Sequence, residues 1–576
     1  MKMKDKILIL LLLLSFMSCG KMLETDSELV EFADDNKLDT PEDTLYSVMG
    51  IIRQLQVVAD RTVLLGELRG DLMQITDRAT TDVQGIVAVP ASDKENMYNR
   101  ISDFYAVINN CNYYIANVNP DAERMSKKYF RNEYIAVKVF RAWTYLQLAK
   151  IYGKVPLVLE PLLTVESAQN AMNMQYTDIQ GICDYFISDL GQYVGAKDDA
   201  DIEYPQYGSV NGFDSKKFFI PLRVILGEMC LWAGRYNEAA TYLHDYLTKT
   251  SNPITTGRGR MSWNNIGGDY DFSKGSIGNS FTSTITDSDA PSVISFIPME
   301  DSEFYGVKSL INMVYNSTEN NNYYAQAIPS AAMRSISRAE DYVMEYEWTS
   351  PAKKDTIRAS KDNLSQGALA AGDLRLYGSY RQYIVNQAIT SDYSSERNTI
   401  LKLHTGIVGM YRSHYIYLLF AEALCRCGYV NSAFAVLKYG LRNEENAVRI
   451  HKAEREAAGE LINFPNDAFT VNNTIGIHGR GCGDSECDKE YVIKPTLTAT
   501  TDSIVMVEDL IVKEMALETA FEGQRYYTLM RIAMRRNDNS YLADPISKRY
   551  GLKNDDLYNK LLNRDNWYLP IETKAK

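Results

Sequence analysis

The stretch Glu228–Leu243, "EMCLWAGRYNEAATYL", aligns without a gap with a second stretch, Glu422–Leu437, "EALCRCGYVNSAFAVL". The identical positions are Glu228 with Glu422, Gly234 with Gly428, Asn237 with Asn431, Ala239 with Ala433, and Leu243 with Leu437. In each copy a helical pattern of apolar residues stops at the glycine, and the next pattern carries a small alanine that lets two helices pack closely. The repeat therefore predicts two helix-turn-helix pairs of the tetratricopeptide-like kind.

Helical patterns continue on both sides of these two copies. Thr40 and Pro41 form an N-cap and a first helical position, and apolar residues follow them at three- and four-residue spacing. A second helix, within "YIAVKVFRAWTYLQLAKIYG", closes at Gly153, and Pro156 prevents its continuation. A third helical region, "VEDLIVKEMALETAFEGQRYYTLMRIAMRR", lies near the end of the chain.

Two long insertions interrupt the helices. Residues 251–322 are rich in glycine, asparagine and serine around one strand-like piece, "SVISFIP", and residues 459–501 form a second such region. The sequence thus predicts a mostly α protein in which tetratricopeptide-like helix-turn-helix pairs form a scaffold with long loop-rich insertions. We expect an N-terminal helical part over residues 37–250 and a C-terminal part over 251–576, in one integrated globular unit.

The N-terminus carries an export signal. Three lysines precede the apolar run Ile7 to Met17, which is far shorter than the roughly 20 residues of a membrane-spanning helix, and the run stops at Ser18 and Cys19. We expect residues 1–18 to be a lipoprotein signal peptide, Cys19 to be lipidated, and the polar stretch 19–36 to be a tether. The alternative is an ordinary secretory peptide with an incidental cysteine.

Composition excludes several classes of protein. The net charge is −13, and lysines and arginines are scattered among acids, so nothing resembles the basic footprint of a nucleic-acid-binding protein. Eight cysteines and five histidines in 576 residues do not suggest a disulfide framework or a histidine-based catalytic site. The 40 tyrosines suggest amphipathic rings that bind sugars or peptides, although many of them must fill helix interfaces.

Two loops resemble metal sites only superficially. In "HGRGCGDSEC", Cys482 and Cys487 with His478 offer three ligands and no fourth, so a local disulfide between the cysteines is favoured over a metal. In "DYDFSKG", Asp269 to Gly275, the glycine falls one place late for a calcium loop and the twelfth position is Ser280 rather than glutamate. We expect neither a metal nor a cofactor, and the sequence leaves calcium binding open.

Taken in order, several of these motifs resemble the SusD/RagB family of nutrient-binding outer-membrane lipoproteins from Bacteroidetes. The motifs are the lipoprotein signal, "LRGD" (Leu68–Asp71), "FRAWTYLQLAKIYGKVPLV", the helix pair at Glu422–Leu437, "ETAFEGQRYYTLMR" (Glu518–Arg531) and the final "YLPI". The "EGQRYY" element departs from the commoner form, in which an aspartate often follows the arginine. The resemblance implies a lipid-anchored protein on the outer face of the outer membrane. It also implies capture of glycans, or of peptides in some branches, for a SusC-like TonB-dependent transporter.

Candidate ligand contacts come from exposed aromatic and polar residues of the loops, where no helix interface demands them. We predict contacts by Trp263, Tyr270 and Tyr305 in the glycine-rich insertion, by Tyr98 and Asn99 ahead of a helix, and by Asp71, Asp77 and Arg78 after the first helix. Asp71 has a second interpretation, as a residue that caps or pairs within the scaffold.

The residues leave three functional interpretations open. The first is a non-catalytic surface receptor for a glycan, or for a peptide as in RagB-type proteins. The second is an exported glycoside hydrolase, although no motif singles out a pair of carboxylates. The third is a helical scaffold that binds only proteins. The first interpretation accounts for the signal peptide and the family resemblance together, and the sequence does not identify the cargo.

Overall fold

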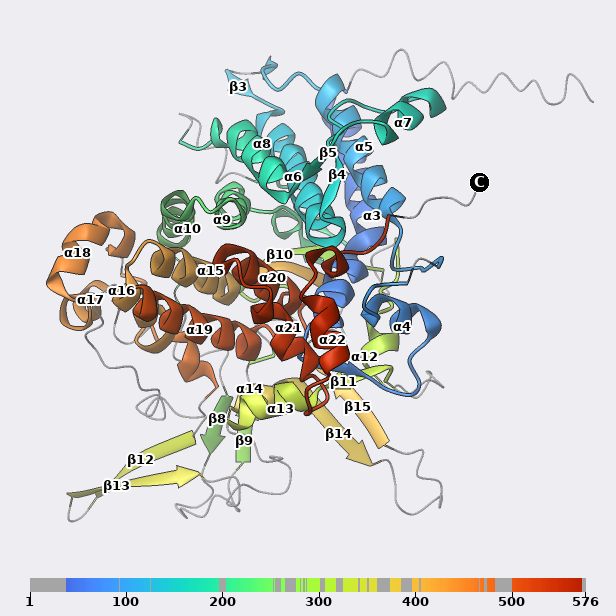
Figure 1. Cartoon of the computed structure of the whole chain (residues 1–576). Helices are drawn as coiled ribbons and strands as arrows, with labels where there is room; N and C mark the ends of the chain where they lie inside the picture. The colour runs from blue at the N-terminus through green and yellow to red at the C-terminus, as the bar shows by residue number, and fades with distance from the viewer. Residues whose placement is uncertain are drawn as a thin grey trace, which may run out of the picture.

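In the computed structural model of this chain (Figure 1), the described residues form a helical body with several strand pairs. The structure describes residues 38–92, 94–124, 126–195, 204–251, 253, 261–264, 276–279, 281–282, 285, 287–300, 306–316, 325–339, 342–349, 352–359, 373–384, 396–402, 406–465, 467–470, 474–481 and 500–571. The predicted signal peptide, Cys19, the tether, Tyr270, Tyr305, Cys482 and Cys487 lie outside these residues. The division into two parts at residue 250 stays a prediction.

Helices make up most of the described chain, as the sequence predicts. Those before residue 250 are α3 (Pro41–Glu67), α4 (Thr81–Val87), α5 (Ile101–Asn117), α6 (Arg131–Tyr152), α7 (Val165–Met172), α8 (Ile179–Gly191), η1 (Ser215–Phe218), α9 (Leu222–Ala233) and α10 (Tyr236–Thr250). The central helices are α12 (Ile311–Tyr315), α13 (Ala331–Arg338), α14 (Leu374–Ser379), α15 (Ser413–Arg426), α16 (Val430–Lys438), α17 (Asn443–Arg449), α18 (Lys452–Ala458), η4 (Gly459–Ile462) and η5 (Ile477–Arg480). The last are α19 (Thr501–Glu518), α20 (Arg525–Arg536), α21 (Ser540–Ser547), α22 (Asp555–Leu561) and η7 (Arg564–Trp567).

The described strands form antiparallel pairs. The pairs are β1 (Met73–Ile75) with β11 (Ala327–Pro329), β2 (Glu123–Arg124) with β3 (Lys127–Lys128), β4 (Lys154–Pro156) with β5 (Tyr176–Asp178), β6 (Ser209–Val210) with β7 (Phe213–Asp214), β8 (Met261–Asn264) with β9 (Ser276–Asn279), β10 (Val293–Pro298) with β16 (Ile407–Arg412), β12 (Tyr342–Thr349) with β13 (Ala352–Ala359), and β14 (Tyr380–Ile384) with β15 (Glu396–Ile400). Strand β10 is the predicted "SVISFIP" strand. Its partner β16 lies far along the chain, with Phe296 opposite Gly409.

The two self-matching stretches both form helical hairpins, as the repeat predicts, and their tetratricopeptide-like kind stays a prediction. Helix α9 ends at Gly234 and α15 is followed by Gly428, and the positive φ angles of these glycines, 73° and 89°, suit a residue without a Cβ. Helix α10 of the first hairpin packs against α15 of the second, so the two copies are neighbours in space (Figure 1).

The helix boundaries follow local signals that the sequence carries. Thr40 accepts a hydrogen bond from the backbone N–H of Asp43, and Pro41 opens α3, as predicted. Helix α6 ends at Gly153, whose φ is 77°. These signals fix where helices begin and end, whereas packing decides how the helices are arranged.

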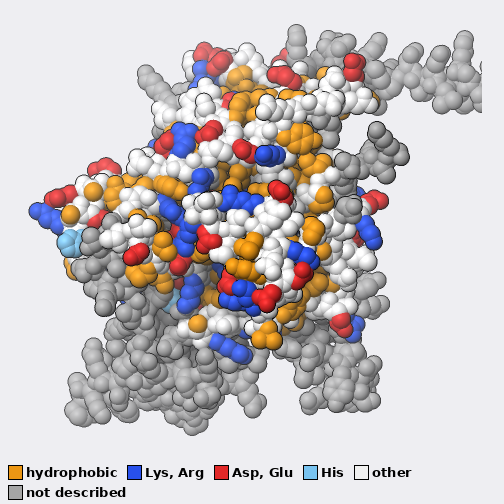
Figure 2. All heavy atoms as spheres, in the orientation of Figure 1, with side chains coloured by type: hydrophobic (Ala, Val, Ile, Leu, Met, Phe, Trp, Pro, Cys, Tyr) orange, Lys and Arg blue, Asp and Glu red, His pale blue; other side chains and the backbone are white. Residues whose placement is uncertain are grey.

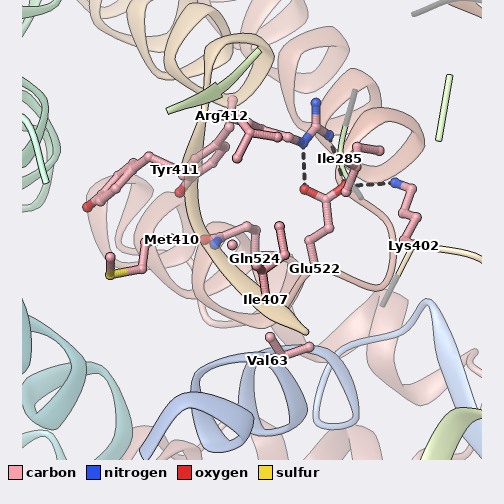
Figure 3. A pocket seen from close by; sticks show the side chains of 12 residues that line it. Val63, Ile285, Lys402, Ile407, Met410, Tyr411, Arg412, Glu522 and Gln524 are labelled. Carbon is pink, nitrogen blue, oxygen red and sulfur yellow. Dashed lines mark hydrogen bonds and ion pairs between the residues drawn. The ribbon is translucent and has the colours of Figure 1, made fainter. Parts of the chain in front are cut away.

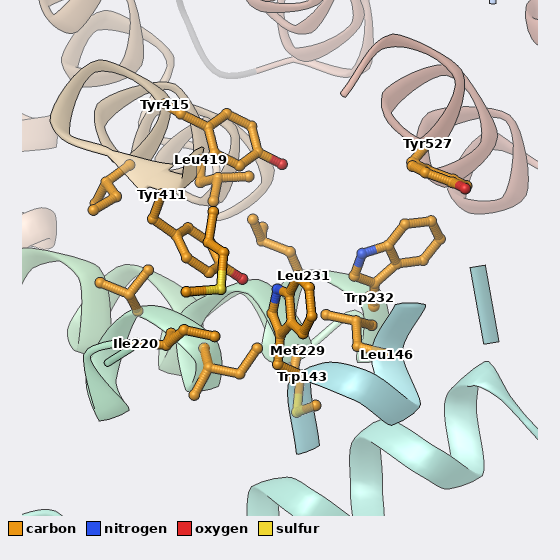
Figure 4. Packing of buried hydrophobic residues seen from close by; sticks show 14 of the residues in the cluster. Trp143, Leu146, Ile220, Met229, Leu231, Trp232, Tyr411, Tyr415, Leu419 and Tyr527 are labelled. Carbon is orange, nitrogen blue, oxygen red and sulfur yellow. The ribbon is translucent and has the colours of Figure 1, made fainter. Parts of the chain in front are cut away.

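The core is one buried cluster with residues from both sides of residue 250. Figure 4 shows Trp143 from α6, Trp232 from α9, Tyr415 from α15 and Tyr527 from α20 around one buried region. Burying one such large side chain stabilises the fold by roughly 1.5–3 kcal/mol, so these residues contribute strongly to the stability of the core.

Two further features bear on the sequence predictions. Cys111, Cys183, Cys230 and Cys425 are buried free thiols on helices, where each packs as a small apolar residue. No helix among the described residues combines the length and apolar character needed to cross a membrane.

Candidate functional site

The residues predicted to contact ligand after the first helix do not share one surface. Asp71 is buried and accepts two hydrogen bonds from Arg525 of α20, with Nε to Oδ1 at 2.6 Å and Nη2 to Oδ2 at 2.9 Å. This ion pair fits the scaffold interpretation of Asp71. Asp77 and Arg78 are exposed just after β1. The predicted cluster of Asp71, Asp77 and Arg78 is therefore divided between the interior and the surface.

Tyr98 and Asn99 lie in the interior. Burial raises the pKa of Tyr98 to about 12, and the Asn99 side-chain amide donates to the carbonyl of Pro570 at 3.0 Å. Trp263 lies on β8, and Tyr270 and Tyr305 fall outside the described residues. Ligand contact by any of the predicted residues stays a prediction.

A groove of about 350 Å³ with an aromatic and polar lining lies at the N-terminal ends of two long helices. We call it the α3/α6 groove. The first turn of α3 forms one wall, the start of α6 with the preceding Tyr129 forms another, and the segment 204–207 forms the third. Its lining residues are Pro41, Glu42, Thr44, Leu45, Tyr129, Phe130, Asn132, Glu133, Tyr204, Pro205, Gln206 and Tyr207.

Tyr129 presents a ring to solvent at the rim of this groove. Its side chain is 51 % exposed, and its ring rests edge-on against Phe130 at 5.4 Å between centroids. Phe130 is buried and precedes the first turn of α6, so it holds the Tyr129 ring on a rigid base. An exposed aromatic face of this kind packs against the apolar C–H face of a sugar ring.

Glu133 is the fixed polar group of the groove. Its Oε1 accepts a hydrogen bond from the hydroxyl of Tyr114, and its Oε2 accepts one from Tyr207 at 2.5 Å. The two donors come from α5 and from the loop before β6, so packing of three segments sets the orientation of the carboxylate. Burial, followed by the nearby charge of Glu133, raises the pKa of both tyrosines, which therefore stay protonated donors.

The groove combines the groups that a polyhydroxylated ligand requires. Tyr129 offers a stacking face, Glu42 and Glu133 accept hydrogen bonds, and the amides of Asn132 and Gln206 both donate and accept them. Its volume lies within the range of about 300–1,000 Å³ typical of small-ligand sites. The arrangement can bind and orient a ligand by these contacts.

A second cavity, shown in Figure 3, lies between β16 and the loop before α20. It has a volume of about 30 Å³, room for one or two water molecules at ~10–15 Å³ each and not for a sugar. Glu522 faces it and pairs with Lys402 at 2.8 Å and with Arg412 at 2.6 Å. We interpret this cavity as part of the scaffold.

A buried charge cluster shares Arg412 with the lining of this cavity. Glu518 of α19 pairs with Arg375 at 2.9 Å, with Arg412 at 2.7 Å and with Arg480 at 3.1 Å. Burial alone would raise the pKa of Glu518, but the positive charges, those of Arg480 and Arg412 above all, hold it well below its usual value. The cluster joins α14, β16, η5 and α19, which are separated in sequence.

His478, weighed in the sequence as a metal ligand, belongs to the same region. It is buried, and its Nδ1 lies 2.8 Å from Oε2 of Glu514. Within the described part of the chain, no three His, Cys, Asp or Glu side chains are arranged to hold a metal ion.

Sequence reasoning did not select Tyr129, Glu133 or Tyr207. The available signals were an aromatic pair, Tyr129 and Phe130, directly before a helix, and the loop "YPQY" at residues 204–207. Neither signal indicates that the two segments meet.

Figure 2 shows the surface in the orientation of Figure 1, with acidic and basic side chains interspersed on this face. This distribution agrees with the scattered charges of the sequence.

Comparison with known proteins identifies the fold. No family model and no curated protein matches the sequence. A SusD superfamily protein from Bacteroides vulgatus ATCC 8482 has a TM-score of 0.57 at 15% identity, over 94% of this chain and 97% of its own. One from Bacteroides thetaiotaomicron VPI-5482 has a TM-score of 0.50 at 17% identity, over 92% and 95%. A SusD-like carbohydrate binding protein from Bacteroides vulgatus ATCC 8482 has a TM-score of 0.51 at 15% identity, over 85% and 83%. The chain therefore has the SusD-like fold along nearly its whole length.

Proposed function

We propose that this protein is a non-catalytic glycan receptor on the cell surface that delivers its cargo to a SusC-like TonB-dependent transporter of the outer membrane. The observation that carries the proposal is the α3/α6 groove, with its exposed aromatic ring and fixed carboxylate, on a SusD-like fold. A structure of this fold that is described as a carbohydrate binding protein supports the same ligand class.

In the proposed mode of binding, a sugar ring stacks on Tyr129 and one of its hydroxyls donates a hydrogen bond to Glu133. Because two tyrosine hydroxyls already hold Glu133, little side-chain freedom is lost when the ligand arrives. The groove is open at the surface, so the cargo can leave it. Moderate affinity suits a receptor that must release its cargo to a transporter.

The location on the membrane follows from the predicted lipid on Cys19. The tether 19–36 can span at most about 65 Å when fully extended. It leads to the start of α3, which is one wall of the groove. We therefore expect the groove to lie near the anchored end of the protein, and Cys19→Ala to release the protein from the membrane fraction of cells.

A run of exposed apolar residues supports the proposed contact with a protein partner. Leu163, Val165, Met174 and Tyr176, on α7 and the segments that flank it, are exposed by 70%, 76%, 44% and 37%. Large apolar side chains gathered in one exposed stretch are typical of a protein contact surface. We expect Leu163→Glu with Val165→Glu to weaken co-purification of a large outer-membrane barrel without changing retention by a glycan.

Affinity electrophoresis through native gels that contain single polysaccharides tests glycan capture. The protein without its signal peptide should be retarded by at least one polysaccharide, and Tyr129→Ala should lose most of the retardation. The matched control is Tyr550→Ala, because Tyr550 is also about half exposed, at 55 %, and does not line the groove.

The alternative outcomes are distinct. Retardation that is unchanged in Tyr129→Ala would mean that the glycan does not bind in the α3/α6 groove. Progressive loss of the polysaccharide would indicate a glycoside hydrolase. Absence of retardation by every polysaccharide tested would contradict glycan capture and favour a peptide cargo or a protein-only scaffold.

A further inference from the structure

Among the described residues, the α3/α6 groove is lined by negative charge and by no cation. Glu42 and Glu133 are among its lining residues, and no lysine or arginine is. The nearest described basic side chains along the chain, those of Lys128 and Arg131, lie 2.9 Å and 3.9 Å from Asp121. Their charges are therefore already directed to an acidic side chain outside the groove.

Neither groove carboxylate is neutralised within the described structure. No described lysine or arginine forms an ion pair with Glu42 or Glu133, and Glu133 is bound by two neutral tyrosine hydroxyls. Such hydroxyls fix the carboxylate without cancelling its charge. A ligand in the groove thus meets a full negative charge that cannot easily turn away.

The helix ends at the groove do not reverse this sign. Helix N-termini attract anions, and both α3 and α6 begin here. Each of them carries its own acid in the first turn, Glu42 and Asp43 in α3 and Glu133 in α6, and these acids already complement the helix dipoles. The field that remains for a ligand is set by the carboxylates.

We propose that this groove selects glycans that lack carboxylate and sulfate groups, so that its cargo is a neutral or amino-bearing polysaccharide. Glu133 accepts a hydrogen bond from a hydroxyl or an ammonium group, whereas an acidic group at the same place meets a like charge. This inference rests on the proposed glycan capture and adds the class of glycan to it.

The test must separate the charge of the groove from the charge of the whole protein, which is −13 and repels acidic polymers by itself. The groove variant is Glu42→Gln with Glu133→Gln. The control variant is Glu166→Gln with Glu444→Gln, two exposed acids in the first turns of α7 and α17 that do not line the groove. Each double variant removes two negative charges from first-turn glutamates. The two variants therefore have the same net charge and differ only in where the charges are removed.

Affinity electrophoresis compares dextran as a neutral probe, chitosan as an amino-bearing probe and polygalacturonate as an acidic probe, among a wider set of neutral polysaccharides. Mobility in a gel without polysaccharide is the reference for each variant. We expect the unchanged protein to be retarded by a neutral or amino-bearing polysaccharide and not by polygalacturonate. The groove variant should bind polygalacturonate roughly tenfold more tightly than the control variant does, the effect of removing one partly screened like-charge contact.

Three results would overturn the inference. Retardation of the unchanged protein by polygalacturonate that is lost in Tyr129→Ala would contradict the charge selection and leave glycan capture intact. Equal binding of polygalacturonate by the groove and control variants would mean that the net charge of the protein, and not the charge of the groove, determines this binding. Retardation by no polysaccharide would overturn glycan capture and this inference together. If the double groove variant does not fold, Glu42→Gln alone serves, because Glu42 is exposed.

Discussion

Replacing Glu422 by glutamine should destabilise the protein strongly, because it leaves a buried guanidinium without its counter-ion. Glu422 lies on α15, and its two carboxylate oxygens accept hydrogen bonds from Arg531 of α20 at 2.8 Å and 2.7 Å. The side chains are only 2% and 1% exposed. The equivalent glutamate of the first hairpin, Glu228, is also buried and pairs with Lys150 at 2.6 Å.

The expected cost is about 3–5 kcal/mol in the free energy of unfolding, the range for removing one partner of a buried ion pair. Burial by itself would lower the pKa of Arg531, but the carboxylate of Glu422 raises it, so Arg531 is charged in the folded protein. Without Glu422 the guanidinium retains weaker partners, namely the ring of Trp232 5.3 Å away, the hydroxyl of Tyr415 and the more distant charge of Glu228. These contacts cannot replace two charge-assisted hydrogen bonds.

Urea unfolding followed by tryptophan fluorescence measures this cost, since Trp232 lies beside the pair. Glu444→Gln, at an exposed site, should stay within about 0.5 kcal/mol of the unchanged protein. The double variant Glu422→Gln with Arg531→Met should lose less than the sum of the two single variants, because no charge is left stranded. A loss below about 1 kcal/mol for Glu422→Gln would refute the reasoning.

Three further predictions concern stability and use the same urea assay. Gly66→Ala should lower the free energy of unfolding by about 1–3 kcal/mol, because the new Cβ would lie 1.8 Å from the carbonyl oxygen of Gly523. The control Gly50→Ala, in the same helix, places its Cβ in open space and should stabilise the protein by up to about 1 kcal/mol. Effects of the same sign in both variants would contradict the close approach at Gly66. The folded-state pKa of Glu518 lies well below 4.5, so the stabilisation by this carboxylate is fully present above about pH 4.5 and is lost as the pH falls through the folded-state pKa. The difference in the free energy of unfolding between the unchanged protein and Glu518→Gln should therefore be smaller at about pH 3 than at about pH 7. The same difference at both pH values would argue against the lowered pKa. Thr500→Ala should cost about 1 kcal/mol, because the Thr500 side chain caps α19, and no change would mean that packing alone holds this end.

The sequence by itself determined the helices and the kind of fold. Thr40 with Pro41, and Gly153, set helix ends through backbone hydrogen bonds and φ angles, which depend on a few neighbouring residues. The repeated glycine and alanine spacing predicted two helical hairpins for the same local reason. Such signals can be identified in a single sequence because each operates within one or two helical turns.

Tertiary structure alone decided which of these elements meet. Tyr114, Glu133 and Tyr207 form one hydrogen-bonded group in the groove although they lie on separate segments of the chain. Asp71 pairs with Arg525 across most of the sequence, which places inside the protein a carboxylate predicted to contact ligand. These contacts depend on how helices that are far apart in the sequence pack together, and this packing cannot be predicted from local residue spacing. The position of the groove and the sign of its charge could therefore be recognised only in the folded protein.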